Sequence, residues 1–439
     1  MKINPISGFS DYPAEKYLIF DTMKKIIKDT YALFGFIPFE TPAVERIETL
    51  KAKGGDDNEI YGIHRLNGEK NDADLALRFD LTVPLARYIA QYEGDIKFPF
   101  KRQHIDRSWR GERAQTGRAR EFYQADIDII GREKLPLFAD VEVIQAIYQT
   151  LKNLNFGGFK IHINNKKILI GFLESIGVEG EKQKDIIAII DKKDKLKIAG
   201  KDIKPFLSEI IKELSIVEEI IKYIQVSEMS KGEIMKFLSK YKNEVLEEGK
   251  KELNFVYDIL LNAGVSENDI CFDNTISRGL NYYTGTIFET FLREAQQYGS
   301  IASGGRYENL VGNFSKNTYP GVGGSIGLTR LFQVLDSLKK FDNEKKSFLD
   351  TLVLNMGDNY IRKYLEIADI LRKEGFSTEI FLDSNIKMQK QLEYANAKNI
   401  HYALIIGEDE IQNNEISIKN LFTGDQERVK FEELKKYFS

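Results

Sequence analysis

The strongest constraint on the fold comes from residues 98–131, where two strand-like runs flank the polar loop GERAQTGRA. Each run has the length and composition of a β-strand, and the glycine within the loop helps the chain to reverse. The pattern therefore predicts a long β-hairpin with a basic tip, and it commits this part of the chain to antiparallel pairing.

Arginine is concentrated in this hairpin. Only 18 of the 63 basic residues are arginine, and six of those lie between positions 102 and 120. A planar, permanently charged guanidinium binds phosphate or carboxylate with two parallel hydrogen bonds, which lysine cannot do. The alternative is a set of ion pairs with the neighbouring acids Glu112, Glu121, Asp126 and Asp128. The six are Arg102, Arg107, Arg110, Arg113, Arg118 and Arg120.

Composition limits the class of protein. A chain of 439 residues is too long for one core, so two or three domains are expected. One cysteine excludes a disulfide framework within the chain, and four histidines without ligand spacing argue against zinc. No apolar run approaches the ~20 residues that span a bilayer, and no signal peptide is recognisable, so we expect a cytoplasmic protein with no membrane contact. The net charge of −4 means that nucleic acid would have to meet a local basic surface.

Periodicity divides the chain into contrasting segments. A helix is predicted over 14–36, an edge or interface strand over 36–44, and a strand, turn and helix over 74–92. Residues 166–264 are helical and rich in lysine and glutamate, which is typical of a solvated inserted module. Strands resume after 268, and a polar stretch near 339–347 precedes an alternating α/β segment with a parallel or mixed sheet.

These pieces alone suggest a polyphosphate site. The arginine hairpin, Arg330 near a helix start, and the carboxylates Glu112 and Asp128 fit a polyphosphate with a metal counter-ion. The glycine turns GGSIG and SGGRYENLVG lack the lysine and the spacing of a P-loop, so P-loop chemistry is disfavoured.

Five segments carry a resemblance to a known family. WRGERAQTGRAREFYQADIDIIG resembles motif 2 of class II histidyl-tRNA synthetases, and GVGGSIGLTRL resembles motif 3. ISRGLNYYTGTIFE and SIASGGRYENLVG resemble the two segments peculiar to that family, and FGFIPFETPAVE is similar to motif 1 at its dimer interface. The resemblance implies an enzyme that joins L-histidine to histidine tRNA with ATP.

The implied fold is a multidomain α/β and α+β chain. An antiparallel-sheet catalytic domain would comprise residues 1–165 and 265–338, interrupted by the helical insertion 166–264. A linker over 339–347 would lead to an α/β anticodon-binding domain over 348–439. The resemblance also implies a homodimer and Mg²⁺ bound with ATP.

The resemblance assigns the nucleotide site to five residues. Arg110 would contact the α-phosphate, Arg330 the γ-phosphate and Arg118 the bent triphosphate tail. Glu112 would help to hold Mg²⁺ and the nucleotide, and Phe122 would stack on adenine.

Histidine would be held by groups that read a neutral imidazole, which donates from one nitrogen and accepts at the other. Asp128 accepts the donor, Tyr283 engages the second nitrogen and Tyr307 closes the pocket. The ammonium would be bound by Asp80, Thr82 and Gln124, and Asp80 is also placed to cap a helix ahead of Pro84.

Two further roles follow from the resemblance. Arg278 would reach the α-phosphate from the side opposite Arg110, so that the two act together in catalysis, and it would lie close to the bound histidine. Arg113, Gln115 and Thr116, at the hairpin tip, would meet the acceptor end of the tRNA.

Some positions depart from the family pattern. Asp80 and Asp128 are shorter than the glutamates of many bacterial members and match the archaeal and eukaryotic type. Asn281, Gly324 and Thr329 also differ from the usual residues, but none removes a catalytic group. A different class of function remains open, because the regulatory subunit of ATP phosphoribosyltransferase shares this fold without charging tRNA.

Overall fold

The computed structural model describes residues 3–52, 59–67, 74–193, 196, 200–277, 283–309, 311–312, 314–341 and 347–438. The chain divides into two compact units. One comprises residues 1–11 and 23–340, and the other comprises residues 12–22 and 341–439. In the described residues no helix is long and apolar enough to cross a membrane.

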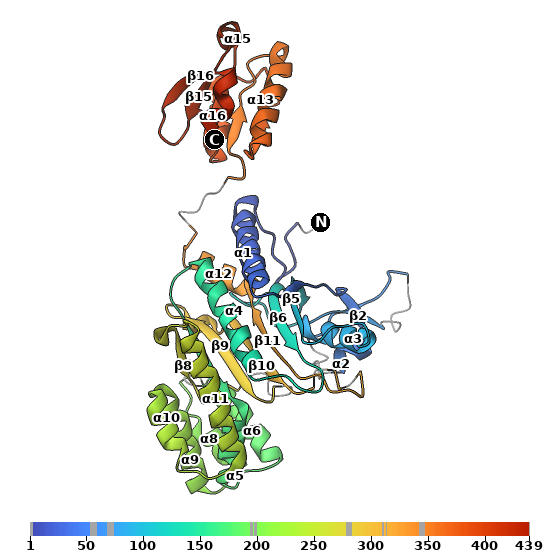
Figure 1. Cartoon of the computed structure of the whole chain (residues 1–439), viewed down its shortest axis with the longest axis vertical. Coiled ribbons are helices and arrows are strands. Elements are labelled where there is room, and N and C mark those ends of the chain that lie inside the picture. The colour runs from blue at the N-terminus through green and yellow to red at the C-terminus, as the bar shows by residue number, and fades with distance from the viewer. Residues whose placement is uncertain are drawn as a thin grey trace. The chain divides into compact units, whose positions relative to one another are not determined.

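The larger unit is built on an eight-stranded mixed sheet (Figure 1). The two outermost pairs, β1 with β5 and β7 with β8, are parallel, and every other neighbouring pair is antiparallel. In spatial order the strands are β1 (Ile37–Pro38), β5 (Phe100–Trp109), β6 (Glu121–Ile130), β11 (Gly321–Ile326), β10 (Ala302–Tyr307), β9 (Thr286–Leu292), β7 (Phe159–Asn165) and β8 (Ile270–Phe272).

The predicted hairpin is confirmed. Strands β5 and β6 pair over their whole length, from Phe100 opposite Ile130 to Trp109 opposite Glu121. At the tip, Gln115 and Arg118 exchange backbone hydrogen bonds of 3.1 and 2.8 Å. Gly117 has a φ of 75°, which favours glycine. The hairpin thus forms the second and third strands of the eight-stranded sheet.

Helices cover this sheet and pack on its strands. Helix α4 (Phe138–Leu154) packs on β6, β10 and β11, while α12 (Leu328–Ser337) packs on β6. Helix α1 (Ala14–Leu33) is followed by Gly35 at a φ of 76°, close to its predicted end. A smaller sheet, with order β2 (Val44–Arg46), β4 (Leu75–Leu77) and β3 (Gly62–Ile63), accompanies α2 (Ile47–Lys51) and α3 (Thr82–Tyr92).

The prediction of a single strand over 36–44 is wrong in one respect. The segment forms two short strands, β1 at the edge of the large sheet and β2 in the small one. Pro38 and Pro42 have no N–H to donate to a ladder, so the chain cannot continue as one central strand. The edge position of Pro38 was predicted.

Residues 166–262 are mainly helical and lie beside the β8 end of the sheet (Figure 1). Buried aromatic rings form part of their core, with Phe172 stacked on Tyr223 at 4.4 Å between centroids. The described helices include α5 (Lys166–Ser175), α6 (Glu181–Asp191), α8 (Lys204–Ile210), α9 (Leu214–Gln225), η1 (Val226–Glu228), α10 (Lys231–Leu238) and α11 (Glu244–Asn262).

This helical segment is tied to the sheet at two points. Tyr223 on α9 donates its hydroxyl to the carbonyl of Asn274, whose amide donates back to the carbonyl of Tyr223, both at 2.7 Å. At the start of α5, Lys166 donates its backbone N–H to Gly285 and its ammonium to the carbonyl of Tyr283, over 2.9 and 2.7 Å. Its helices therefore hold backbone on both sides of residues 275–282.

The second unit contains a five-stranded mixed sheet. Helices α13 (Ile361–Lys373) and α16 (Leu434–Phe438) pack on one face, and α14 (Met388–Ala397) packs on the other. The predicted mixed α/β fold is confirmed, whereas β16 was not predicted because its QERVK sequence is almost entirely polar. The strand order is β13 (Thr378–Ile380), β12 (Thr351–Val353), β14 (Tyr402–Ile405), β15 (Glu415–Asn420) and β16 (Gln426–Lys430), with α15 (Glu408–Asn413) before β15.

Candidate active site

Two adjoining pockets open on one face of the large sheet. The first, here called the arginine pocket, is lined by side chains from the hairpin and from the turn into α12. It gathers all five residues predicted to bind ATP, together with Ser303 of β10 and Ser325 of β11. Its charged and aromatic lining comprises Arg110, Glu112, Arg118, Phe122, Tyr123 and Arg330.

Arg110 and Phe122 lie against each other in the arginine pocket. The guanidinium carbon of Arg110 lies 5.1 Å from the centroid of the Phe122 ring, and Nε donates to the carbonyl of Phe79 at 3.0 Å. The ring and the carbonyl therefore fix the position of the guanidinium.

The other two arginines are also held by the protein. Arg330 donates from Nε to the carbonyl of Gly117 and from Nη1 to the carbonyl of Ser300, both at 2.7 Å. Arg118 Nε lies 2.7 Å from the carboxylate of Glu112. The alternative interpretation, that the hairpin arginines form ion pairs, is therefore partly right. The hairpin tip also connects Arg118 with Arg330, because Arg330 binds the carbonyl of Gly117, the residue before Arg118.

The second pocket, here called the acid pocket, gathers the described residues predicted to bind histidine. Arg110, Gln124, Ser303 and Ser325 line both pockets, so the two are continuous. The full lining is Asp80, Thr82, Arg110, Gln124, Asp126, Asp128, Tyr283, Ser303, Tyr307, Gly323, Gly324 and Ser325.

Asp128 is held by two buried partners. Its Oδ2 lies 2.6 Å from Arg102 Nη2, and its Oδ1 accepts a hydrogen bond of 3.0 Å from the Tyr307 hydroxyl. Burial raises the pKa of Asp128, although Arg102 and Tyr307 act against it. Arg102 was assigned to the arginine cluster but to no site, and it proves to be fully buried behind the pocket.

Asp126 adds a second buried carboxyl that the sequence analysis did not assign to the pocket. Burial raises the pKa of Asp126 to about 7, although Arg102 and Ser325 favour its ionised form. Beside it, Gln124 donates from its amide to the hydroxyl of Ser325 at 3.2 Å. The acid pocket therefore contains a carboxyl that changes charge near neutral pH.

Asp80 caps helix α3, as predicted. Its Oδ1 accepts hydrogen bonds of 3.2 and 2.9 Å from the backbone N–H groups of Thr82 and Val83. This cap places both Asp80 and Thr82 at the rim of the acid pocket.

Glycines in β11 make space for the polar side chains. A Cβ on Gly323 would lie 2.2 Å from Asp128 Oδ1, and one on Gly321 would lie 2.3 Å from the Tyr307 ring. At Gly324 a Cβ would lie 2.9 Å from Phe288, so the ring of this phenylalanine occupies that space. Thr329 accepts a hydrogen bond of 2.8 Å from the Tyr123 N–H.

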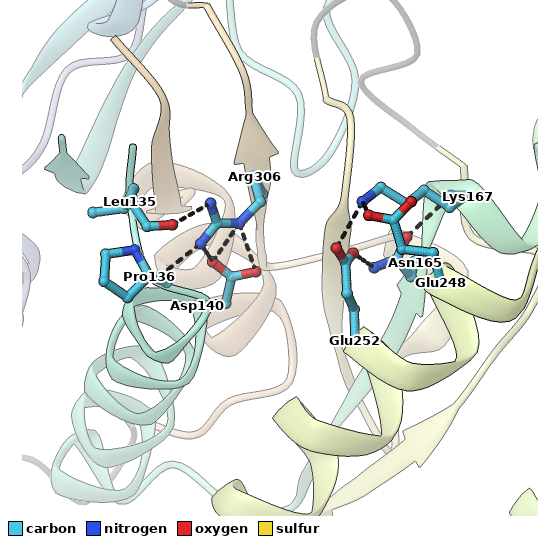
Figure 2. Close-up of polar contacts among 8 residues, drawn as sticks. All are labelled: Leu135, Pro136, Asp140, Asn165, Lys167, Glu248, Glu252 and Arg306. Carbon is cyan, nitrogen blue, oxygen red and sulfur yellow. Dashed lines mark hydrogen bonds and ion pairs between the residues drawn. The ribbon is translucent and has the colours of Figure 1, made fainter. Parts of the chain in front are cut away.

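A buried ion pair fixes β10 from its other face (Figure 2). Arg306 donates from Nε to both oxygens of Asp140 at 2.9 and 3.2 Å, and from its terminal nitrogens to the carbonyls of Leu135 and Pro136. Because successive residues of a strand face opposite sides, this anchor leaves the next residue, Tyr307, on the acid pocket. No pattern in the sequence pointed to Asp140, which lies 166 positions away.

Three predicted site residues lie outside the two pockets. Arg113, Gln115 and Thr116 are exposed at the hairpin tip. Arg278 falls outside the described residues, although Ser277 and Tyr283 on either side of that gap are placed.

Comparison with known proteins identifies the family of the chain. The family described as Histidyl-tRNA synthetase matches residues 8–331, and the family described as Anticodon binding domain matches residues 350–439. The chain belongs to the histidyl-tRNA synthetase family.

Individual relatives match the chain over nearly its whole length. The chain is 42% identical to Histidine--tRNA ligase of Clostridium tetani, covering 99% of this chain and 97% of that one. It is 37% identical to the Finegoldia magna protein of the same name, covering 98% and 97%. The crystal structure of histidyl-tRNA synthetase from Nostoc sp. PCC 7120 matches with a TM-score of 0.89 and 35% identity, covering 100% of this chain and 99% of that one.

A fold likeness also extends to a protein from Bacillus halodurans described as an ATP phosphoribosyltransferase regulatory subunit/histidyl-tRNA synthetase. That match has a TM-score of 0.74 and 20% identity, covering 90% of this chain and 97% of that one. At this identity the likeness concerns the fold alone.

Proposed function

We propose that this synthetase activates L-histidine with ATP and transfers the histidyl group to the 3′ end of histidine tRNA. The observation that carries the proposal is the continuity of the arginine pocket with the acid pocket at Arg110. A nucleotide in the first pocket and an amino acid in the second would meet at this guanidinium. This placement suits attack of the carboxylate on the α-phosphate, with loss of pyrophosphate.

In the proposed adenylation, Arg110 binds the α-phosphate and Arg330 binds the γ-phosphate. Arg118 contacts the triphosphate tail, and Phe122 stacks on adenine. The attack brings two anions together, so a fixed cation at the α-phosphate stabilises the charge that builds up in the transition state. Arg278 is proposed as a second such cation, on the opposite side.

Histidine recognition is assigned to the acid pocket. Asp128 accepts the imidazole N–H, Tyr283 engages the second ring nitrogen, and Tyr307 orients Asp128 through its hydroxyl. Asp80, Thr82 and Gln124 bind the ammonium. An amino acid without the imidazole could not make the hydrogen bonds that Asp128 and Tyr283 offer to the ring, and well-built sites of this kind discriminate by ~10⁴-fold or more.

Mg²⁺ is proposed to bind with ATP. Carboxylate oxygen is a preferred magnesium ligand, and Glu112 lines the arginine pocket. Magnesium would neutralise phosphate charge, while Arg118 holds the Glu112 carboxylate in place. Among the described residues no cluster of three or more acidic, histidine or cysteine side chains is arranged to hold a metal ion by itself, in keeping with a magnesium that arrives with the nucleotide.

Two surfaces are proposed for tRNA. The exposed hairpin tip, with Arg113, Gln115 and Thr116, would meet the acceptor end. Residues 348–439 would bind the anticodon region, joined by the linker 339–347. The catalytic domain would consist of residues 1–165 and 265–338, which precede and follow the insertion 166–264 in the sequence.

The active form is proposed to be a cytoplasmic homodimer. Strand β1 lies at the edge of the large sheet and carries the motif 1 resemblance, which suits a two-fold contact between identical surfaces. Sedimentation of the purified protein should give about twice 50.5 kDa, and an active monomer would contradict this assignment.

Histidine-dependent exchange of pyrophosphate into ATP, followed by charging of purified histidine tRNA, tests the proposed function. We expect both reactions. Histidine binding without either reaction would instead favour a regulatory role like the one named for the Bacillus halodurans protein. Gln115→Ala should reduce charging and leave exchange intact, which separates the tRNA surface from the adenylation site.

A further inference from the structure

Asp126 lies between the two groups of acid-pocket residues to which histidine recognition is assigned. On strand β6 it stands between Gln124, assigned to the ammonium, and Asp128, assigned to the imidazole. Alternate residues of a strand face the same side, and all three side chains line the acid pocket. None of the roles proposed above uses Asp126, although its carboxyl lines the pocket together with those of Asp80 and Asp128.

The side chain of Asp126 is buried without a full set of donors. Its exposed fraction is 3%, and among the described residues nothing donates a hydrogen bond to Oδ1. Ser325 of β11 stands directly opposite Asp126, and its hydroxyl accepts a hydrogen bond of 3.2 Å from Gln124. A buried carboxylate that lacks donors is costly, which indicates that a ligand of the pocket supplies one.

The buried arginine of this region is paired with the other carboxyl. Arg102 Nη2 lies 2.6 Å from Asp128 Oδ2 and donates to the carbonyl of Leu81 at 3.3 Å. Asp126 is thus a second carboxyl beside a cation that already has a partner, which agrees with the pKa of about 7 that burial gives it. Arg110, at the junction of the two pockets, is assigned to the α-phosphate. The cation best suited to favour ionised Asp126 is therefore one that enters with the substrate.

Histidine offers two kinds of nitrogen to such a carboxylate. A neutral imidazole has one N–H, which Asp128 accepts in the proposed binding mode. The ammonium has three N–H groups and a full charge. Of its assigned partners, Thr82 and Gln124 are neutral, and Asp80 already uses Oδ1 to cap α3. The ammonium is therefore the group whose charge and hydrogen bonds a further carboxylate completes.

We propose that Asp126 is a specificity-determining residue whose carboxylate binds the ammonium of L-histidine together with Asp80, a role that rests on the proposed function because it requires histidine to bind in the acid pocket. The pocket would then distinguish an α-amino acid from the same side chain without an amino group by a buried charge pair. A hydrogen bond between charged groups of this kind corresponds to ~10- to 100-fold in affinity.

Two ligands that differ only in the ammonium test this assignment. They are L-histidine and 3-(imidazol-4-yl)propionate, and their binding to the full-length protein is measured by calorimetry at pH 8. Asp126→Asn should weaken L-histidine ~10- to 100-fold and change the affinity for the propionate by less than ~3-fold. Glu93→Gln is the matched control, because it also turns a carboxylate of the larger unit into an amide, but outside both pockets, and should change neither affinity.

The wild-type protein provides a second test through pH. Since burial holds the pKa of Asp126 at about 7, the ammonium must displace a proton from this carboxyl at lower pH. The preference for L-histidine over the propionate should therefore fall ~10-fold from pH 8 to pH 6. The imidazole titrates in both ligands, so its contribution cancels in the ratio, and Asp126→Asn should show no such change.

Other groups near Asp126 would keep their effect in the variant. The His104 ring stands opposite Asp126, and burial lowers its pKa. Any contribution from this ring to the pH dependence would persist in Asp126→Asn. The charged and titratable groups around Asp126 are Asp128 of β6, Arg102 and His104 of β5, Asp80 ahead of α3, Tyr31 of α1, and Arg110, Tyr283 and Tyr307 of the pocket lining.

Two results would overturn the proposal and leave the proposed function intact. One is a folded Asp126→Asn protein that binds L-histidine as tightly as the wild type. The other is an equal loss of affinity for both ligands, which would place Asp126 against the ring. If the variant does not fold, the wild-type ratio decides, and an unchanged ratio between pH 6 and 8 contradicts the ammonium contact. A wild-type protein that binds neither ligand would refute the proposed function as well.

Discussion

Arg102 Nη2 lies 2.6 Å from Asp128 Oδ2, and both side chains are almost completely buried beneath the acid pocket. Arg102 also stands directly opposite Asp128 in the β5–β6 hairpin. Asp128 is the carboxylate proposed to accept the imidazole N–H. Its charge thus depends on Arg102, which bound histidine would not contact.

Replacement of this arginine should affect both stability and recognition. Arg102→Leu leaves a buried carboxylate without its cation, which costs ~3–5 kcal/mol of unfolding free energy when such a pair is broken. The pKa of Asp128 should rise further, and kcat/KM for histidine should fall ~10-fold or more. Urea unfolding and pyrophosphate exchange measure the two effects. Arg107→Leu is the matched control, because its contact with Glu121 is 3.5 Å long and half exposed and should be worth under ~1 kcal/mol.

The hydroxyl of Tyr307 is predicted to set histidine affinity. Tyr307→Phe removes the donor that holds Asp128 Oδ1 at 3.0 Å. A hydrogen bond to a charged group contributes ~1.5–3 kcal/mol, so KM for histidine should rise ~10- to 100-fold with KM for ATP nearly unchanged. Steady-state exchange kinetics test this. Tyr319→Phe removes a buried tyrosine hydroxyl that donates to Glu93, outside both pockets, and should leave KM for histidine unaltered.

Gly323 should not tolerate a side chain. The Cβ of Gly323→Ala would lie 2.2 Å from Asp128 Oδ1, so the carboxylate must move away from Arg102 and Tyr307. We expect histidine binding, measured by calorimetry, to weaken ~10-fold or more. Gly232→Ala is the control, because a Cβ there meets nothing within 4 Å, and in helix α10 alanine should stabilise the protein by up to ~1 kcal/mol. Unchanged affinity in Gly323→Ala would place histidine elsewhere.

The raised pKa of Asp126 predicts a pH dependence of stability. An aspartate in the unfolded chain ionises near pH 3.9, whereas Asp126 in the folded protein ionises at about 7. Between these values the folded protein keeps a proton that the unfolded chain releases, so this contribution to stability is complete below about pH 4 and is lost as pH rises to about 7. Relative to Asp126→Asn, the wild type should lose up to ~1.4 kcal/mol of unfolding free energy per pH unit across that window.

Asp106 provides the opposite case in the same hairpin. Burial would raise the pKa of Asp106, but the nearby His104 ring, the backbone N–H of Arg107 and the Arg78 guanidinium together outweigh burial and lower it. Its contribution is therefore present above about pH 4 and lost as pH falls further. The unfolding free energy of the wild type relative to Asp106→Asn should therefore rise with pH below about pH 4, which is the sign opposite to that expected for Asp126. Urea unfolding at pH 3 to 8 measures both differences, and the same sign in both cases would refute these assignments.

The pocket residues that could be predicted from sequence are those carried by local motifs. Arg110, Phe122 and Asp128 lie in one hairpin, and the hairpin register already pairs positions whose numbers sum to 230, so Arg102 opposite Asp128 was predictable once the turn was placed. The edge position of Pro38 followed in the same way from the missing N–H.

Contacts between distant segments could not be predicted. Arg306 and Asp140 are joined only after β10 and α4 have packed, and no periodicity links positions 166 residues apart. The raised pKa of Asp126 depends on burial by β11 and its neighbours, which a sequence pattern does not measure.

The ties from Tyr223 to Asn274 and from Lys166 to Tyr283 have a consequence for synthesis and for engineering. Residues 166–262 leave the ribosome before residues 274–285, so the helices can form first and present Tyr223 and Lys166 to the backbone carbonyls of Asn274 and Tyr283. A chimaera that replaces these helices with those of a relative should retain histidine activation only if the incoming helices present an equivalent tyrosine and lysine.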